Sequence, residues 1–136
     1  MIFTIPGEPQ GKGRPRVVRQ GGFARAYTPE KTASYENLVK VEYQRARGIM
    51  YAGDVQLRMT ITAHYGIPKS VSKIKRAAMV KGIIRPVKKP DADNVAKVIC
   101  DALNGVAYRD DTQIVHLAVS KWYDDEPCVV VEIDEV

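Results

Sequence analysis

The sequence predicts a single small α+β domain, spanning residues 1–136, in which helices cover one side of a mixed or antiparallel sheet. The length and the hydrophobic share of 45% suit one globular core. Period-two and helical apolar patterns follow one another in the order strand, arm, helix, strand, helix, helix, strand, strand. One long strand has a polar face, so we expect the helices to pack on its other face.

The N-terminal part predicts a strand and an arm. Met1–Ile5 is an apolar run that Pro6 ends, as a short strand would be. Residues 7–20 are rich in Gly, Pro and Arg, which predicts an ordered loop or a hairpin arm. The Gly-Gly pair at 21–22 marks a turn, and residues 23–27 predict a short return strand.

Two helices and a long strand follow. Thr28 as N-cap and Pro29 at the first helical position predict a helix that ends at Gly48. Val55–Tyr65 alternates apolar and polar residues over its whole length, as a strand with one buried face does. Residues 70–80 predict a short basic helix.

The C-terminal part predicts a helix and a hairpin. Asp93–Leu103 carries its apolar residues on one face, and Asn104 follows as a C-cap signal. Gln113–Tyr123 and Cys128–Glu135 predict two strands. The turn residues between these strands predict that they pair as an antiparallel hairpin.

Charge is distributed unevenly along the chain. Residues 1–89 hold 18 Lys/Arg and five Asp/Glu, whereas residues 90–136 hold three and 11. Between Asp54 and Asp91 there is no acidic residue, but there are nine basic ones. A basic face beside a compact acidic cluster suits an enzyme that holds a polyanion and places metal ions on it. The alternative is a solvated surface with uneven charge.

Several functional classes are not expected. No apolar run approaches the roughly 20 residues that span a bilayer, and Pro6 and Pro9 interrupt the only candidate for an export signal. We therefore expect a cytoplasmic protein without a membrane partner. Cys100 and Cys128 have neither metal-site spacing nor a disulfide framework, which predicts free thiols and no zinc site.

The start of the last helix carries the chemistry. Pro90 keeps the preceding residue out of the helical region, so we expect Asp91 in extended chain and Asp93 at the opening of the helix. Two carboxylates one residue apart can converge on one metal ion if the chain bends between them. Lys97 lies one turn later and leans back toward them, where a cation can stabilise the charge of a phosphate during cleavage.

A structural alternative fits the same segment. Capping and the helix dipole favour acids at helix N-termini, and Asp93, Lys97 and Asp101 could form a surface salt-bridge ladder. Two observations favour a metal site: Asp91 is surplus to capping, and the pair Asp110-Asp111 opens the next strand. If the chain returns along a helix of roughly 16 Å, Asp111 comes back beside Asp91 and Asp93. Three carboxylates suit Mg²⁺ or Mn²⁺.

These motifs resemble the RusA-type crossover junction endodeoxyribonucleases of bacteria and their phages. The matching stretches are residues 91–97, 101–105 and 108–114, and residues 6–16 look like the phage branch of the family. The resemblance implies a RusA-like fold and a bacterial or phage-encoded, Mg²⁺-dependent endonuclease. It also implies resolution of four-way (Holliday) junctions by paired phosphodiester hydrolysis, and a homodimer with two active sites. No organic cofactor is expected.

The resemblance implies residue roles as well. The implied catalytic residues are Asp91, Asp93, Lys97 and Asp111. The three acids among them are the implied ligands of Mg²⁺, with Mn²⁺ as a substitute. Asp101 matches a further motif acid, to which we assign the orienting of Lys97. Asn94 either supports the metal shell or only begins the helix, and only one of Asp110 and Asp111 should point into the cluster, because neighbours on a strand face opposite sides.

Basic residues outside the cluster are candidate DNA contacts. The Gly/Pro-rich arm has no acid between Pro9 and Pro29, and it is either a mobile solvated arm or a phosphate-binding one. The candidates in the arm and on the surface beyond it are Lys12, Arg14, Arg16, Arg19, Lys69, Lys73, Arg76, Lys88 and Lys89.

Two other functions compete with junction resolution. One is a general Mg²⁺-dependent nuclease that acts on flaps or other branched nucleic acids. The other is a non-catalytic DNA-binding module whose acids are structural. A binding module gains nothing from anions beside its ligand, so the acids near Lys97 favour an enzyme.

Overall fold

The structure, a computed structural model, describes residues 1–13, 16–27 and 29–136, and between residues 14 and 28 the one side chain described is that of Arg19. The predicted N-cap Thr28 lies outside the described residues. In chain order the elements are β1 (Ile2–Pro6), β2 (Arg16–Gln20), β3 (Phe23–Tyr27), α1 (Glu30–Arg45), β4 (Leu57–Gly66), α2 (Lys73–Val80), α3 (Ala92–Leu103), the 3-10 helix η1 (Asp111–Gln113), β5 (Ile114–Asp124) and β6 (Cys128–Glu135).

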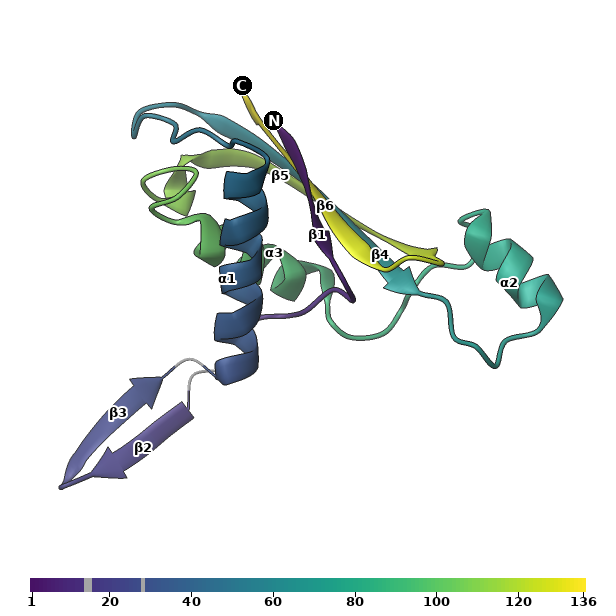
Figure 1. The fold of residues 1–136 in the computed structure, drawn as a ribbon, viewed down its shortest axis with the longest axis horizontal. Coiled ribbons are helices and arrows are strands. Elements are labelled where there is room, and N and C mark those ends of the chain that lie inside the picture. Colours follow the sequence, from purple (N-terminus) through teal and green to yellow (C-terminus); the bar gives the residue numbers. More distant parts are fainter. Residues whose placement is uncertain (14–15, 28) are drawn as a thin grey trace.

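Four strands form a mixed sheet in the order β1-β6-β4-β5 (Figure 1). The β1–β6 and β6–β4 pairs are antiparallel, and the β4–β5 pair is parallel. On β4 the apolar residues are fully buried and the polar ones between them are exposed or half-buried, as the alternation predicts. The predicted α+β fold is confirmed.

The predicted hairpin of the last two strands is wrong. β5 and β6 are not neighbours in the sheet, because β4 lies between them and pairs with both. The turn after β5 crosses the end of β4, where Gly66 lies opposite Asp124 and His64 lies opposite Cys128. Long-range burial decides this order: β4 has the most regular apolar face, and the centre of the sheet satisfies the backbone groups of both its edges.

The core lies between the sheet and the helices α1 and α3. Helix α3 buries seven of its residues, and α1 adds Tyr35, Val39 and Tyr43. This packing fixes α3 across the sheet, and so it fixes where the acids at its start lie. No helix in the described part of the chain combines the length and the apolar character needed to cross a bilayer. Both cysteines are free thiols, with Cys100 buried.

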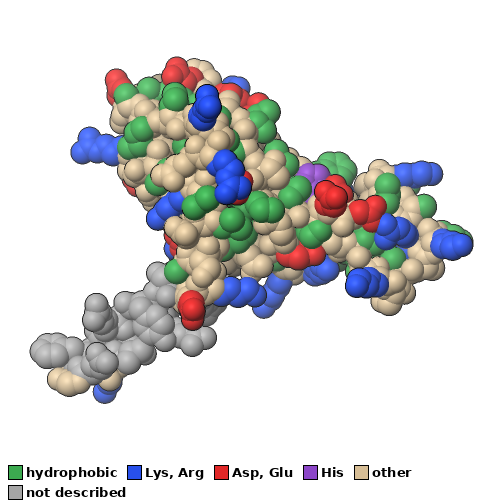
Figure 2. All heavy atoms as spheres, in the orientation of Figure 1, with side chains coloured by type: hydrophobic (Ala, Val, Ile, Leu, Met, Phe, Trp, Pro, Cys, Tyr) green, Lys and Arg blue, Asp and Glu red, His purple; other side chains and the backbone are tan. Residues whose placement is uncertain are grey.

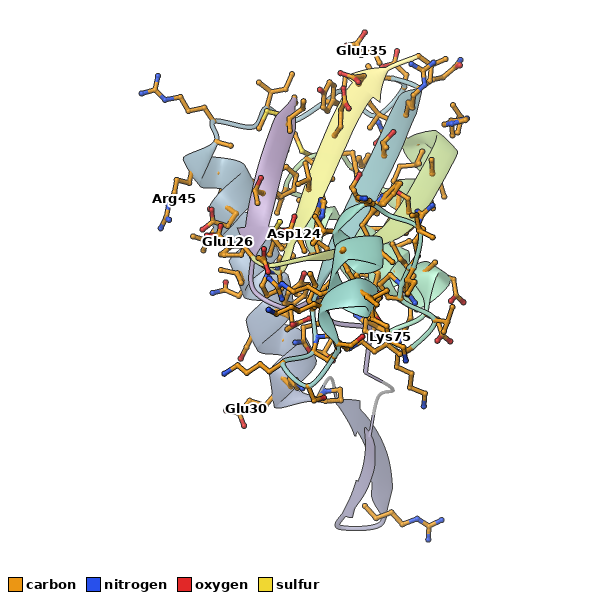
Figure 3. All side chains as sticks on the ribbon, turned by 90° about the vertical axis from the view of Figure 1, so that its right-hand side faces the viewer. Glu30, Arg45, Lys75, Asp124, Glu126 and Glu135 are labelled. Carbon is orange, nitrogen blue, oxygen red and sulfur yellow. The ribbon has the colours of Figure 1, made fainter. Side chains whose placement is uncertain are left out.

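Two projections extend from this body. Strands β2 and β3 pair with each other alone, which confirms the hairpin arm, and both turn glycines have positive φ. Figure 3 shows the arm leaving the end of the molecule where Glu30 begins α1, far from Arg45 and Glu135. Helix α2 projects at another side, and Lys and Arg side chains gather on it (Figures 1 and 2).

Candidate active site

Asp91 ends an extended segment and begins α3. Its backbone is extended, and its carbonyl oxygen accepts hydrogen bonds from the N–H groups of Asn94 and Val95. Its carboxylate makes no capping hydrogen bond with the described residues of the helix, and the residue is exposed. The carboxylate is therefore free for another ligand, which the capping alternative does not explain.

One pocket gathers most of the predicted site. Its volume is about 540 Å³, and its lining residues are Lys12, Gly13, Asp91, Asp93, Asn94, Lys97 and Asp101. Asp93, Lys97 and Asp101 are spaced by four residues along α3, so they share the face of the helix that is turned away from the core. Two predicted metal ligands and the predicted catalytic lysine thus border the same space.

The ion pair of Asp101 joins α3 to the segment that leads into the arm. Lys12 Nζ lies 3.2 Å from Asp101 Oδ2 and 2.8 Å from Glu36 Oε1. Burial alone would lower the pKa of Lys12, but hydrogen bonds and charges from Glu36 and Asp101 outweigh it and raise the pKa. Lys97 forms no ion pair with the described residues, so the surface ladder is not formed. The orienting of Lys97 by Asp101 stays a prediction.

Asp111 lies in η1, which contacts α3. Burial raises the pKa of Asp111, the charges of Asp110 and Asp101 raise it further, and Lys97 opposes the shift. The two members of the acidic pair differ: Asp110 is exposed and accepts a hydrogen bond from Thr112 Oγ1 at 2.8 Å, whereas Asp111 is half-buried. Asp111 is thus the member that approaches the α3 face.

The three predicted ligands are not drawn into one group. Within residues 1–13, 16–27 and 29–136, no three Asp, Glu, His or Cys side chains are close enough together to hold one ion. Asp91 and Asp93 border the pocket, and Asp111 feels the charges of Asp101 and Lys97 instead. The donor set still fits magnesium, because Mg²⁺ is commonly held by one or two carboxylates together with water and substrate phosphate.

A buried tyrosine holds the chain just before Asp91. Tyr65 is 1% exposed, and its hydroxyl donates to the Pro90 carbonyl oxygen at 2.5 Å. Burial raises the pKa of Tyr65 to about 12, with further contributions from the negative charges of Asp91 and Glu8. Sequence reasoning placed Tyr65 on the buried face of its strand and missed this contact. The sequence signal that could have found it is a tyrosine on the buried face of a strand, because a buried tyrosine hydroxyl needs a hydrogen-bond partner.

Lys121 holds the same segment from β5. Its Nζ donates to the Lys88 carbonyl oxygen at 2.7 Å and lies 5.0 Å from the centre of the Tyr65 ring. Its own carbonyl oxygen accepts from Arg85 Nε at 2.7 Å, and that guanidinium stacks 3.6 Å from the Trp122 ring. The path of the chain into the acidic pocket is therefore fixed by side chains from β4 and β5.

The predicted DNA contacts are spread over three regions. Lys12 is engaged in its ion pairs, Arg14 lies outside the described residues, and Arg16 has a described backbone only. Arg19 is exposed on the arm. Lys69, Lys73 and Arg76 are exposed around α2, where Arg76 pairs with Asp125. Lys88 and Lys89 are exposed in the segment that leads to Asp91.

This chain is similar to known proteins over nearly its whole length. The family model described as "Endodeoxyribonuclease RusA" matches residues 6–134. A relative from Bacillus subtilis (strain 168), "Uncharacterized protein YqaN", is 41% identical over 137 residues, which cover 98% of this chain and 95% of the relative. The family match includes the segment before the arm, the α3 motif and the acidic pair. The chain belongs to the RusA family of endodeoxyribonucleases.

Proposed function

We propose that this protein is a Mg²⁺-dependent endonuclease that resolves four-way DNA junctions by paired phosphodiester hydrolysis. The observation that carries the proposal is the pocket at the start of α3, where Asp91 and Asp93 lie with Lys97 in a chain of this family. Acids left free of capping beside a lysine suit a metal ion and a phosphate together.

Asp91 and Asp93 would hold the ion, and Asp111 would complete the set of carboxylates. When bound, Mg²⁺ or Mn²⁺ would supply an activated water and stabilise the leaving 3′ oxygen. Asp111 supports this role through its environment, because burial and neighbouring acids raise its pKa. A nearby divalent cation would offset the repulsion between the Asp111 carboxylate and the neighbouring carboxylates of Asp110 and Asp101.

Lys97 would act on the phosphate. It is exposed on the pocket side of α3, one turn after Asp93, and it forms no ion pair with a carboxylate of the described residues. An ammonium in this place stabilises the charge that develops on the phosphate during cleavage. Lys12 is held by Glu36 and Asp101, so it contributes to the site by fixing these groups. Asn94 and Asp101 would support the site without reacting.

Branched DNA in the cytoplasm of a bacterium would be the substrate, and two copies of the chain would act on it. One chain offers one acidic pocket, whereas resolving a junction needs two symmetric incisions, which a two-fold dimer supplies. The exposed basic residues of the arm and of α2 would contact phosphates of the junction arms. A general nuclease for flaps is the second candidate, favoured by the open basic surface.

The test offers the purified protein a synthetic four-way junction, a matched linear duplex and a flap, each with and without Mg²⁺. We expect Mg²⁺-dependent cleavage of the junction. Asp91→Asn and Asp93→Asn should each lower cleavage about 100-fold or more while binding persists, and Asp54→Asn, an exposed acid outside the pocket, serves as control. Full activity of both pocket variants would refute the site.

A further inference from the structure

We propose that a second groove, beside the acidic pocket, binds the nucleotide next to the scissile phosphate and holds its base out of the helical stack. The inference rests on the proposed function, since it names a part of the substrate for the same site. The groove has a volume of about 730 Å³, which lies within the roughly 300–1,000 Å³ of small-molecule sites.

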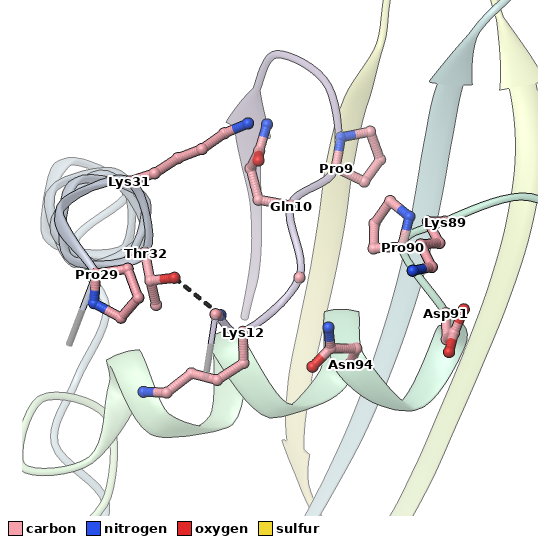
Figure 4. Close-up of a pocket in the computed structure, with 12 residues that line it drawn as sticks. Pro9, Gln10, Lys12, Pro29, Lys31, Thr32, Lys89, Pro90, Asp91 and Asn94 are labelled. Atoms are coloured by element: carbon pink, nitrogen blue, oxygen red, sulfur yellow. Dashed lines mark hydrogen bonds between the residues drawn. The ribbon is translucent and has the colours of Figure 1, made fainter. Parts of the chain in front are cut away.

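The groove continues directly from the acidic pocket. Both are lined by Lys12, Gly13, Asp91 and Asn94. A DNA strand whose phosphate lies between Asp91 and Lys97 therefore runs into the groove at its next nucleotide. Figure 4 shows the groove between the start of α1, the start of α3 and the segment that precedes the arm.

The walls suit the face of a base. Pro9, Pro29 and Pro90 line the groove from three separate segments of the chain. Pro9 is buried, whereas Pro29 and Pro90 are half-buried, and their rigid, apolar rings offer flat contact without losing conformational freedom on binding. Enzymes that take a base out of the stack commonly hold it between apolar side chains.

The rim suits the edge of a base and its phosphates. Gln10 and Asn94 carry side-chain amides, which can pair with donors and acceptors on a base edge. Lys31 and Lys89 are exposed at the same rim, and Figure 4 labels Lys31, Gln10 and Asn94 among the residues around the groove. A nucleotide has this combination of an apolar face, a polar edge and negative charge.

The groove is built into the fold by two glycines. A Cβ at Gly11 would lie 2.4 Å from Asn94 Nδ2, and one at Gly13 would lie 2.5 Å from Thr32 Oγ1. Hydrogen bonds from two backbone N–H groups hold the segment in place: Gly13 N donates to Thr32 Oγ1 at 2.8 Å, and Lys12 N donates to the Asn94 carbonyl oxygen at 3.4 Å. The groove is therefore present before DNA binds, which lowers the cost of binding.

A base held here would be read at its edge, so the groove predicts a sequence preference at the cut. An unpaired or weakly stacked base next to a branch point would enter at least cost. Junctions would then be favoured over linear duplex partly because they supply such a base.

The test uses four-way junctions that carry 2-aminopurine in turn at each nucleotide around the branch, bound in Ca²⁺. We expect fluorescence to rise on binding at one position, next to the cut that Mg²⁺ permits. Gln10→Ala combined with Lys31→Ala should lose most of this rise. Lys40→Ala, on the same helix as Lys31 but outside the groove, should keep it.

A second measurement compares cleavage of a junction that is abasic at that position. Losing one base contact should slow the wild-type protein about tenfold and slow the double variant little further. No fluorescence rise at any position, or an equal abasic penalty in both proteins, would overturn the groove. Cleavage without a fluorescence rise refutes the groove alone, whereas a rise without any cleavage in Mg²⁺ refutes the nuclease and leaves the groove as a DNA-binding site.

Discussion

Asp111 is a predicted metal ligand whose pKa the fold raises. It is half-buried, and burial and the charges of Asp110 and Asp101 all raise its pKa. Asp111→Asn should therefore raise the unfolding temperature of the protein in chelator at neutral pH. Because the raised pKa means that protonation favours the folded state, this advantage should shrink as the pH falls through the pKa of Asp111.

Thermal unfolding in chelator and in Mg²⁺, over a series of pH values, measures both effects. Mg²⁺ should stabilise the wild-type protein more than Asp111→Asn. Asp54→Asn, exposed and outside the acidic pocket, should behave like the wild type. A variant that is less stable than the wild type in chelator would show that the charge of Asp111 holds the fold rather than a metal ion.

Lys97 distinguishes a phosphate contact from a surface ion pair. Lys97→Ala should lower turnover roughly 100-fold, the usual effect of removing one group that stabilises transition-state charge, and should leave the unfolding temperature unchanged. Arg45→Ala removes a true surface pair, with Glu42 at 3.2 Å, and should show a small stability loss with normal turnover. If Lys97→Ala gives the pattern of Arg45→Ala, the lysine does not act on the phosphate.

Tyr65 tests whether the segment before Asp91 must be held in place. Tyr65→Phe leaves the Pro90 carbonyl oxygen without its donor, which should cost about 1 kcal/mol of stability. It should also raise the Mg²⁺ concentration needed for half-maximal cleavage, since Asp91 follows directly. Tyr43→Phe breaks a matched hydrogen bond, to the Ile49 carbonyl oxygen at 2.5 Å, far from the acids. If Tyr65→Phe and Tyr43→Phe need the same Mg²⁺ concentration for half-maximal cleavage, Tyr65 stabilises the fold but does not position Asp91.

At the scale of elements, the β2–β3 arm projects from the body of the molecule, and Arg19 on it is exposed. Neutralising Arg14 and Arg16 to Gln should weaken junction binding and reduce the slope of log affinity against log salt by about 1.8 if both contact phosphates. Arg45 and Arg47 lie at the other end of α1 and give a control with equal loss of charge. An unchanged slope would show that the arm does not touch the DNA.

Local patterns predicted most elements but not all of their partners. The alternation of β4 and the apolar face of α3 are properties of consecutive residues, so both were predicted from sequence. The pairing of β5 depends on which strand enters the centre of the sheet. A short turn after β5 predicts a hairpin equally well whether the next strand pairs with it or crosses to the far side of β4.

In the site, too, local spacing predicted some residues, whereas contacts between distant segments were not predicted. Asp91, Asp93 and Lys97 follow from their spacing around the start of one helix, and they line one pocket. The contacts that support them come from distant segments: Tyr65 reaches the site from β4, and Glu36 reaches it through Lys12. No local pattern marks such partners, because a buried tyrosine or a helix-surface glutamate fits many other roles.

At the scale of the whole molecule, the open edge of the sheet bears on assembly. β5 is an edge strand, and Val115 and Leu117 on it are 58% and 47% exposed. Exposed apolar edges favour association with another copy. We expect a solution mass of twice the chain mass of 15.1 kDa, measured by light scattering at the concentrations used for cleavage. A monomeric mass there would leave a general nuclease as the better account.

Mapping the incisions on a four-way junction tests the central claim most directly. Each strand is end-labelled in turn and cleaved by the wild-type protein in Mg²⁺, with a matched linear duplex present in excess. The account predicts two cuts at symmetry-related positions on opposing strands, none in chelator, and little competition by the duplex. Single unpaired cuts, or cleavage that the linear duplex suppresses as well as an unlabelled junction does, would contradict it.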